Sequence, residues 1–245
     1  VFFMAGLCIL MGISLRLSWP MCLNMLILGA LFSHMAFGNI GSTKYIPISL
    51  AALLFFIYPP LVTLINAVIN KKYPGLIKLI AIGITFSGLG VMLGIGFEQF
   101  DYRGIIIGLT AGIACAINIV WVNRRVKNVH PFVIVFYQSI IAAVIILVLA
   151  IELEELRFPE NRVGWWGFAL IILLQSCSIP LFYFSIQRIG PESTGLFNNL
   201  QPVASIVAAV VIFNEILTGE RLVGAFMVLL GIIIVQLLEY KRIRH

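Results

Sequence analysis

The side chains best suited to bind a solute are polar ones that stand inside apolar stretches of the chain. Five of them form a predicted polar wall: Asn198, Asn199, Gln201, Gln175 and Ser178. Carboxamides offer hydrogen-bond donors and acceptors without a fixed charge, which suits zwitterionic or polar neutral solutes better than a permanent ion. Hydrogen bonding between helices would account equally well for each side chain taken singly, so both interpretations stay open.

A second set of aromatic and amide side chains is expected to line the same site. These residues are Tyr58, Asn118, Trp121, Tyr137, Gln138 and Tyr183. Their aromatic faces would accept an apolar part of a substrate. Aromatic residues also anchor proteins at the membrane interface, and we expect that role for Trp19, Trp165 and Trp166.

Three prolines inside apolar stretches, Pro59, Pro180 and Pro202, are candidate kinks. A proline within a helix removes a backbone donor and clashes with the preceding turn. A cavity, water or a neighbouring helix must then satisfy the freed carbonyls. We predict a gating role at these positions, with a static kink as the alternative.

His34 is the one titratable residue near the middle of an apolar stretch. Histidine titrates near neutral pH, so a proton-coupling role is one interpretation. A neutral, hydrogen-bonded histidine is the other. Unaltered pH dependence of transport in a His34→Gln variant would remove the coupling hypothesis.

The elements that position these side chains are long apolar stretches. Hydrophobic residues make up 61% of the 245 residues, and stretches close to the ~20 residues that span a bilayer recur along the whole chain. They cover about residues 1–15, 22–43, 46–69, 76–96, 104–123, 131–151, 164–187, 191–213 and 222–239. This pattern predicts an all-α polytopic membrane protein with about nine transmembrane helices. The first stretch is short for a span, and we expect one further helix ahead of Val1.

Basic residues collect in every second gap between these stretches. One set of gaps holds eleven of them: Arg16, Lys71, Lys72, Lys78, Arg124, Arg125, Lys127, Arg188, Lys241, Arg242 and Arg244. The other set holds five: Lys44, Arg103, Arg157, Arg162 and Arg221. By the positive-inside rule the first set is cytoplasmic. We therefore expect an integral plasma (inner) membrane protein with a cytoplasmic C-terminus.

The remaining composition excludes several kinds of partner. The net charge of +6 comes from short juxtamembrane clusters without interleaved aromatics, so the lipid bilayer is expected as a partner and nucleic acid is not. The four cysteines lack CxxC spacing, and we predict no metal site and no cofactor.

The two halves of the chain repeat one another weakly at an offset of 143 residues, which pairs Pro59 with Pro202 and Gly88 with Gly231. We predict repeats over residues 1–97, incomplete at the N-terminus, and 104–240. An odd number of helices in each repeat would insert the two copies in opposite orientations. Pro59 and Pro202 would then occupy matching positions, where transporters often break a helix at the substrate site.

A stripe of small residues, Gly104, Gly108 and Gly112, follows one face of the stretch at 104–123. Small residues at this spacing let helix backbones approach closely. We expect packing within the chain, and a homodimer through the same stripe is the alternative.

The run from Gly190 to Val203, then Phe213 to Glu220, then Gly224 and Gly231, resembles the second repeat of EamA-like members of the drug/metabolite transporter superfamily. The resemblance implies ten helices in two inverted five-helix repeats, of which the first helix is missing from this sequence. It also implies export of a small metabolite.

The leading hypothesis is a secondary transporter, an exporter of a small metabolite such as an amino acid or a related polar or amphipathic solute, working by alternating access. The alternatives are a non-transporting or inactive truncated membrane subunit and, less favoured, a membrane-embedded enzyme. No GxxxxGK[ST], HExxH, GxSxG or DxxxD pattern is present, so we predict neither nucleotide-driven transport nor catalytic residues.

Overall fold

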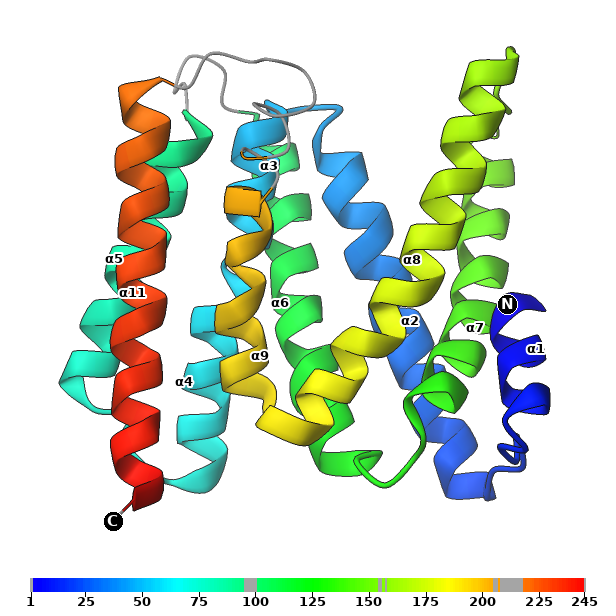
Figure 1. Ribbon diagram of the computed structural model, residues 1–245. Helices are drawn as coiled ribbons and strands as arrows, with labels where there is room; N and C mark the ends of the chain where they lie inside the picture. Colours follow the sequence, from blue (N-terminus) through cyan, green and yellow to red (C-terminus); the bar gives the residue numbers. More distant parts are fainter. Residues whose placement is uncertain are drawn as a thin grey trace. The chain divides into compact units, whose positions relative to one another are not determined.

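The computed structural model describes residues 2–94, 101–153, 156, 158–204, 207 and 218–244, and the regular elements in these ranges are all helices (Figure 1). They are α1 (Phe2–Leu10), α2 (Trp19–Ser42), α3 (Ile48–Phe55), α4 (Tyr58–Asn70), α5 (Leu76–Leu93), α6 (Tyr102–Arg125), α7 (Pro131–Glu152), α8 (Arg162–Ile189), α9 (Pro191–Asn198) and α11 (Gly219–Arg244). The predicted class, an all-α polytopic membrane protein, is confirmed.

The helices follow the apolar stretches closely. The predicted segments at 22–43, 76–96, 104–123, 131–151 and 164–187 correspond to α2, α5, α6, α7 and α8. The segment at 46–69 is divided into α3 and α4. Within the described ranges, five helical stretches are long and apolar enough to cross a membrane: Trp19–Ser42, Leu50–Asn70, Tyr102–Arg125, Pro131–Glu152 and Arg162–Ile189. Most of the segment from 205 to 217, with Glu215, lies outside the described residues.

The chain forms two compact units, and each draws on both halves of the sequence. Unit 1 comprises Val1–Phe37 and Trp121–Gly190, and unit 2 comprises Gly38–Val120 and Pro191–His245. The long helices α2 and α6 contribute residues to both units. The units therefore differ from the repeats predicted at 1–97 and 104–240, and the repeat boundaries stay a prediction.

Unit 1 is built around α7, which packs against α1 and α8. Helix α2 also approaches α7, because a Cβ atom added at Gly29 would lie 2.5 Å from the Cβ of Ile141. The Nε2 of Gln187 near the end of α8 donates to the carbonyl of Val129 at 2.8 Å. Helix α7 thus contacts α1, α2 and α8, and the residues just before α7 bond to the end of α8.

Unit 2 contains a closely packed pair of helices, α5 and α11, which are joined by glycines. A Cβ atom at Gly88 would lie 2.8 Å from the carbonyl oxygen of Gly224 and 3.0 Å from the backbone nitrogen of Val228. A Cβ atom at Gly231 would lie 2.7 Å from the carbonyl oxygen of Ala81 and 2.0 Å from the Oγ1 of Thr85. Only glycine permits backbones to meet at these distances.

The glycine stripe on α6 is buried inside unit 2. Added Cβ atoms would lie 2.8 Å from Ile46 at Gly104, 3.3 Å from Leu54 at Gly108 and 2.7 Å from the carbonyl oxygen of Leu54 at Gly112. The stripe therefore packs against residues of its own chain. Pairing with a second copy through this stripe stays a prediction.

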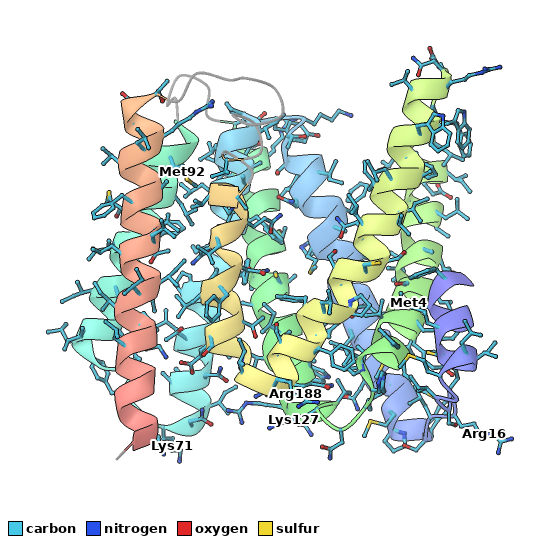
Figure 2. All side chains as sticks on the ribbon, viewed as in Figure 1. Met4, Arg16, Lys71, Met92, Lys127 and Arg188 are labelled. Atoms are coloured by element: carbon cyan, nitrogen blue, oxygen red, sulfur yellow. The ribbon has the colours of Figure 1, made fainter. Side chains whose placement is uncertain are left out.

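Figure 2 locates four basic residues of the larger set. Figure 2 shows Arg16, Lys127 and Arg188 at one end of unit 1. In unit 2, Lys71 lies at the end where α11 finishes, opposite Met92 (Figures 1 and 2). The cytoplasmic placement of the larger set stays a prediction.

Candidate solute-binding site

The segment that carries Pro59 is broken directly before that proline. Helix α3 ends at Phe55, Phe56 and Ile57 form a turn, and α4 starts at Tyr58 with Pro59 and Pro60 at its N-terminus. The amide of Phe56 donates to the carbonyl of Ala52 at 2.9 Å, which closes the end of α3. Proline is tolerated in a first turn because the amide it lacks would have no partner there.

A second break stands just ahead of Pro202. Helix α9 ends at Asn198, and the amide of Asn199 donates to the carbonyl of Leu196 at 3.0 Å in a tight turn. Residues 200–204 are helical again, and Pro202 within them is buried. The structure therefore interrupts a helix ahead of each proline that the offset of 143 residues pairs. A gating role of the two breaks stays a prediction.

Pro180 behaves differently, because it lies inside a helix that continues through it. Helix α8 remains helical from Arg162 to Ile189 and bends part-way along its length (Figure 1). Pro180 is buried in unit 1. It bends a continuous helix, whereas the other two prolines follow an interruption.

The broken helices α4 and α9 meet in unit 2. A Cβ atom at Gly195 would lie 3.5 Å from the Cα of Pro59 and 3.8 Å from the Cε2 of Tyr58. Tyr58 is 1% exposed, with its ring packed on Phe56 at 6.2 Å between centroids. The side chain of Asn198 comes close to the Tyr58 hydroxyl without completing a hydrogen bond.

Buried polar atoms without partners occur on α4 and in the turn that follows α9. Among the described residues, the buried side-chain atoms that lack a hydrogen bond are the Tyr58 hydroxyl, the Thr63 Oγ1 and the Asn199 Oδ1. Leaving such a group buried and unsatisfied costs about 1–3 kcal/mol each. Folded proteins keep few such groups, and a bound molecule is one way to satisfy them. The α4–α9 contact is therefore the candidate site.

A small pocket lies beside Asn199. Its lining consists of Phe56, Pro59, Pro60, Ile82, Thr85, Phe86, Leu89, Leu196 and Asn199. The space between these atoms, counted with the mouth, is about 200 Å³, and it is too narrow in this conformation for a water-sized molecule.

One ion pair in unit 2 was not predicted from the sequence. The Lys78 Nζ near the start of α5 is paired with the Glu192 Oε2 in the first turn of α9. A sign of it in the sequence is the position of Glu192 within a predicted apolar segment. Every other Asp and Glu stands at or beyond the end of such a segment. The partner of Glu192 stands 114 residues away, and no spacing rule identifies it.

Four residues of the predicted lining belong to unit 1, where three hydrogen bonds occupy them. The Tyr183 hydroxyl donates to the Gln138 Oε1 at 2.6 Å, and both side chains are 1% exposed. The Trp121 Nε1 donates to the Asn24 Oδ1 at 2.9 Å. The Tyr137 hydroxyl donates to the carbonyl of Leu15 at 2.7 Å. These contacts join separate segments of unit 1, and the substrate-lining role of the four residues stays a prediction.

The other predicted residues are dispersed. Gln175 and Ser178 are exposed and bond to each other at 3.3 Å, Gln201 is exposed, and Asn118 is buried with an interaction partner. His34 is exposed, and within the described ranges it has neither a hydrogen bond nor an ion pair. The proton-coupling role of His34 stays a prediction. No three His, Cys, Asp or Glu side chains in the described part of the chain come together as metal ligands.

The chain is similar to several curated proteins. It is 25% identical over 209 residues to an uncharacterized transporter from Synechocystis sp., covering 82% of this chain and 62% of the relative. It is 30% identical over 135 residues to the uncharacterized inner membrane transporter YhbE of Escherichia coli, covering 53% of this chain and 41% of that protein. The chain thus spans less than two thirds of the length of these relatives.

The fold also matches a solved structure. A crystal structure aligns with 95% of this chain and 82% of its own, with a TM-score of 0.76 and 20% sequence identity. The helical architecture is therefore shared. Residues 102–237, more than half of the 245, match the EamA-like transporter family, and the chain, an integral membrane protein, belongs to that family.

Proposed function

We propose that this protein exports a small polar or amphipathic metabolite, of the size of an amino acid, across the plasma (inner) membrane. The C-terminus would be cytoplasmic, and transport would proceed by alternating access without nucleotide hydrolysis. The observation that carries the proposal is the contact of α4 and α9, which both adjoin a break, together with buried polar atoms without partners beside both breaks, the Tyr58 hydroxyl and the Asn199 Oδ1. Transporters commonly place their substrate site at breaks in matching helices of two repeats.

The chemistry of the contact suits an uncharged polar group on the solute. The Tyr58 hydroxyl can donate a hydrogen bond, and the Asn199 Oδ1 can accept one. No acidic or basic side chain lines the adjoining pocket. A solute carrying both a donor and an acceptor would satisfy both atoms at once, which favours the conformation that holds it.

The two walls of the contact also differ in rigidity. Helices α4 and α9 each begin or end at a break, whereas α5 is joined to α11 through Gly88, Gly224 and Gly231. Hinges form where a few terminal residues of an element can change their dihedral angles. We therefore assign the movement of alternating access to the segments around Phe56 and Asn199.

The proposal is tested by comparing metabolites in the medium and the cytosol of cells that express the chain. We expect a small set of related metabolites to accumulate outside only with the parent chain, and to fall in a Tyr58→Phe, Asn199→Leu double variant. Gly83→Ala is the control, because a Cβ atom at Gly83 meets nothing within 4 Å. Verified insertion with identical metabolite profiles would contradict export and favour a non-transporting subunit.

A further inference from the structure

The pocket beside Asn199 has one fixed wall and two walls at helix breaks. Its fixed wall is α5, which contributes Ile82, Thr85, Phe86 and Leu89. Behind that wall, α11 packs against α5 at distances that exclude even a methyl group. The opposite walls come from the turn and first residues of α4 and from the end of α9. We therefore expect the walls at the breaks to move when the pocket widens.

The lining is apolar with a single free acceptor. Seven of the lining side chains are pure hydrocarbon: Phe56, Pro59, Pro60, Ile82, Phe86, Leu89 and Leu196. The hydroxyl of Thr85 already donates to the carbonyl of Ala81 at 2.9 Å. Asn199 is 3% exposed and keeps its Oδ1 without a partner. The pocket is thus complementary to an uncharged apolar group that carries one hydrogen-bond donor.

The pocket is narrow as the helices stand, because its walls leave no room for a water-sized molecule. A solute group could therefore enter only after the walls move apart. The residues of the wall, and not the present size of the pocket, indicate what kind of group it would accept.

We propose that this pocket is the subsite for the apolar side group of the transported solute. In the open form, the Asn199 Oδ1 accepts a hydrogen bond from an N–H or O–H on that group. This inference rests on the proposed function, and it restricts the substrates to amphipathic solutes whose apolar part bears a donor.

The experiment measures binding of two uncharged probes, indole and 1-methylindole, which differ in the N–H. Both are titrated against the purified chain in lipid nanodiscs, with empty nanodiscs subtracted for partition into lipid. We expect the parent chain to bind indole about five-fold more tightly than 1-methylindole, the effect of one neutral hydrogen bond. Asn199→Leu should abolish this preference, and Asn199→Asp, which keeps an acceptor, should retain it.

Two further variants test whether the probes bind in this pocket or elsewhere on the chain. Leu89→Trp should fill the pocket and weaken both probes, because Leu89 is 1% exposed and lines it. Asn39→Leu is the matched control, since it makes the same chemical change outside the lining and should leave the preference unchanged. Equal binding of both probes by the parent, or a preference that survives Asn199→Leu, would overturn the subsite.

The outcomes also distinguish the two proposals. Metabolite export by a chain that shows no preference for indole would overturn the subsite and leave the proposed function standing. A preference that depends on Asn199, in a chain that exports nothing, would overturn the proposed function and with it the transport role of the pocket.

Discussion

The Lys78 ammonium on α5 is paired with the Glu192 carboxylate on α9, and the two side chains are 11% and 29% exposed. The pair holds the start of α9 against the fixed α5–α11 pair. The other end of α9 stops at the break before Asn199. Helix α9 is therefore anchored at one end and interrupted at the other.

Neutralising one member of this pair should lower stability. Glu192→Gln removes the carboxylate from a mostly buried ammonium, and we expect a loss of about 1–2 kcal/mol, between the values for exposed and buried pairs. Thermal unfolding in detergent measures the change. The charge-reversed double variant Lys78→Glu, Glu192→Lys should recover part of it, and no recovery would show that the attraction between the charges is unimportant.

The glycines between α5 and α11 should resist even a methyl group. Gly224→Ala would place a Cβ atom 2.5 Å from the backbone nitrogen of Met92 and 2.6 Å from the carbonyl oxygen of Gly88. We expect a destabilisation of about 1–3 kcal/mol from overpacking. Gly83→Ala on the open face of α5 should be neutral or stabilising, because alanine is the better helix former. Similar unfolding temperatures for the two variants would contradict the close packing.

The buried pair of Tyr183 and Gln138 should behave as one unit. Tyr183→Phe leaves the Gln138 Oε1 without its donor and should cost about 1–2 kcal/mol. A second change, Gln138→Leu, should then cost less than it does alone, because the partner is already absent. A double-mutant cycle on unfolding free energies gives the coupling. Strictly additive changes in unfolding free energy would show that the hydrogen bond between the two side chains does not contribute to stability.

Replacing Asn199 should lower transport without lowering stability. Asn199→Leu removes a buried acceptor that has no partner, so we expect an unfolding temperature equal to or above that of the parent. Metabolite export should fall at the same time, since the group that would hold the solute is gone. A lower unfolding temperature with retained export would place Asn199 among the purely structural residues.

The C-terminus should lie in the cytoplasm. A fused green fluorescent protein should fluoresce, whereas a fused alkaline phosphatase should be inactive, because each reporter matures on one side of the inner membrane only. Lys241→Glu, Arg242→Glu and Arg244→Glu together should weaken this orientation, as the positive-inside rule requires. An active phosphatase fusion in the parent chain would invert the predicted topology.

Helix positions were predictable from the sequence because apolar length is a local property. The stretch at 131–151 became α7 (Pro131–Glu152) with a difference of one residue. The break ahead of Pro59 agrees with local chemistry, since proline is favoured in the first turn of a helix. Pro180 shows that the residue type alone does not decide between a break and a bend, because α8 continues through it. Local signals therefore account for most of the fold.

The partners of side chains were not predictable, because a sequence does not say which helix faces which. Trp121 and Tyr137 have the composition of a substrate-lining pair, yet they bond to Asn24 and to the carbonyl of Leu15. The ion pair of Glu192 with Lys78 likewise depends on how α5 and α9 pack. The partners of these side chains depend on contacts between segments that are far apart in the sequence.

The contacts between α5 and α11 are reciprocal. Gly88 meets Gly224 and Val228, and Gly231 meets Ala81 and Thr85, which are the same contacts shifted by 143 residues. Two-fold symmetric dimers contact each other in this way, each copy using one patch against itself. The contact between α5 and α11 thus has the form of a homodimer interface within one polypeptide. Duplication and fusion of an ancestral gene would produce such an interface.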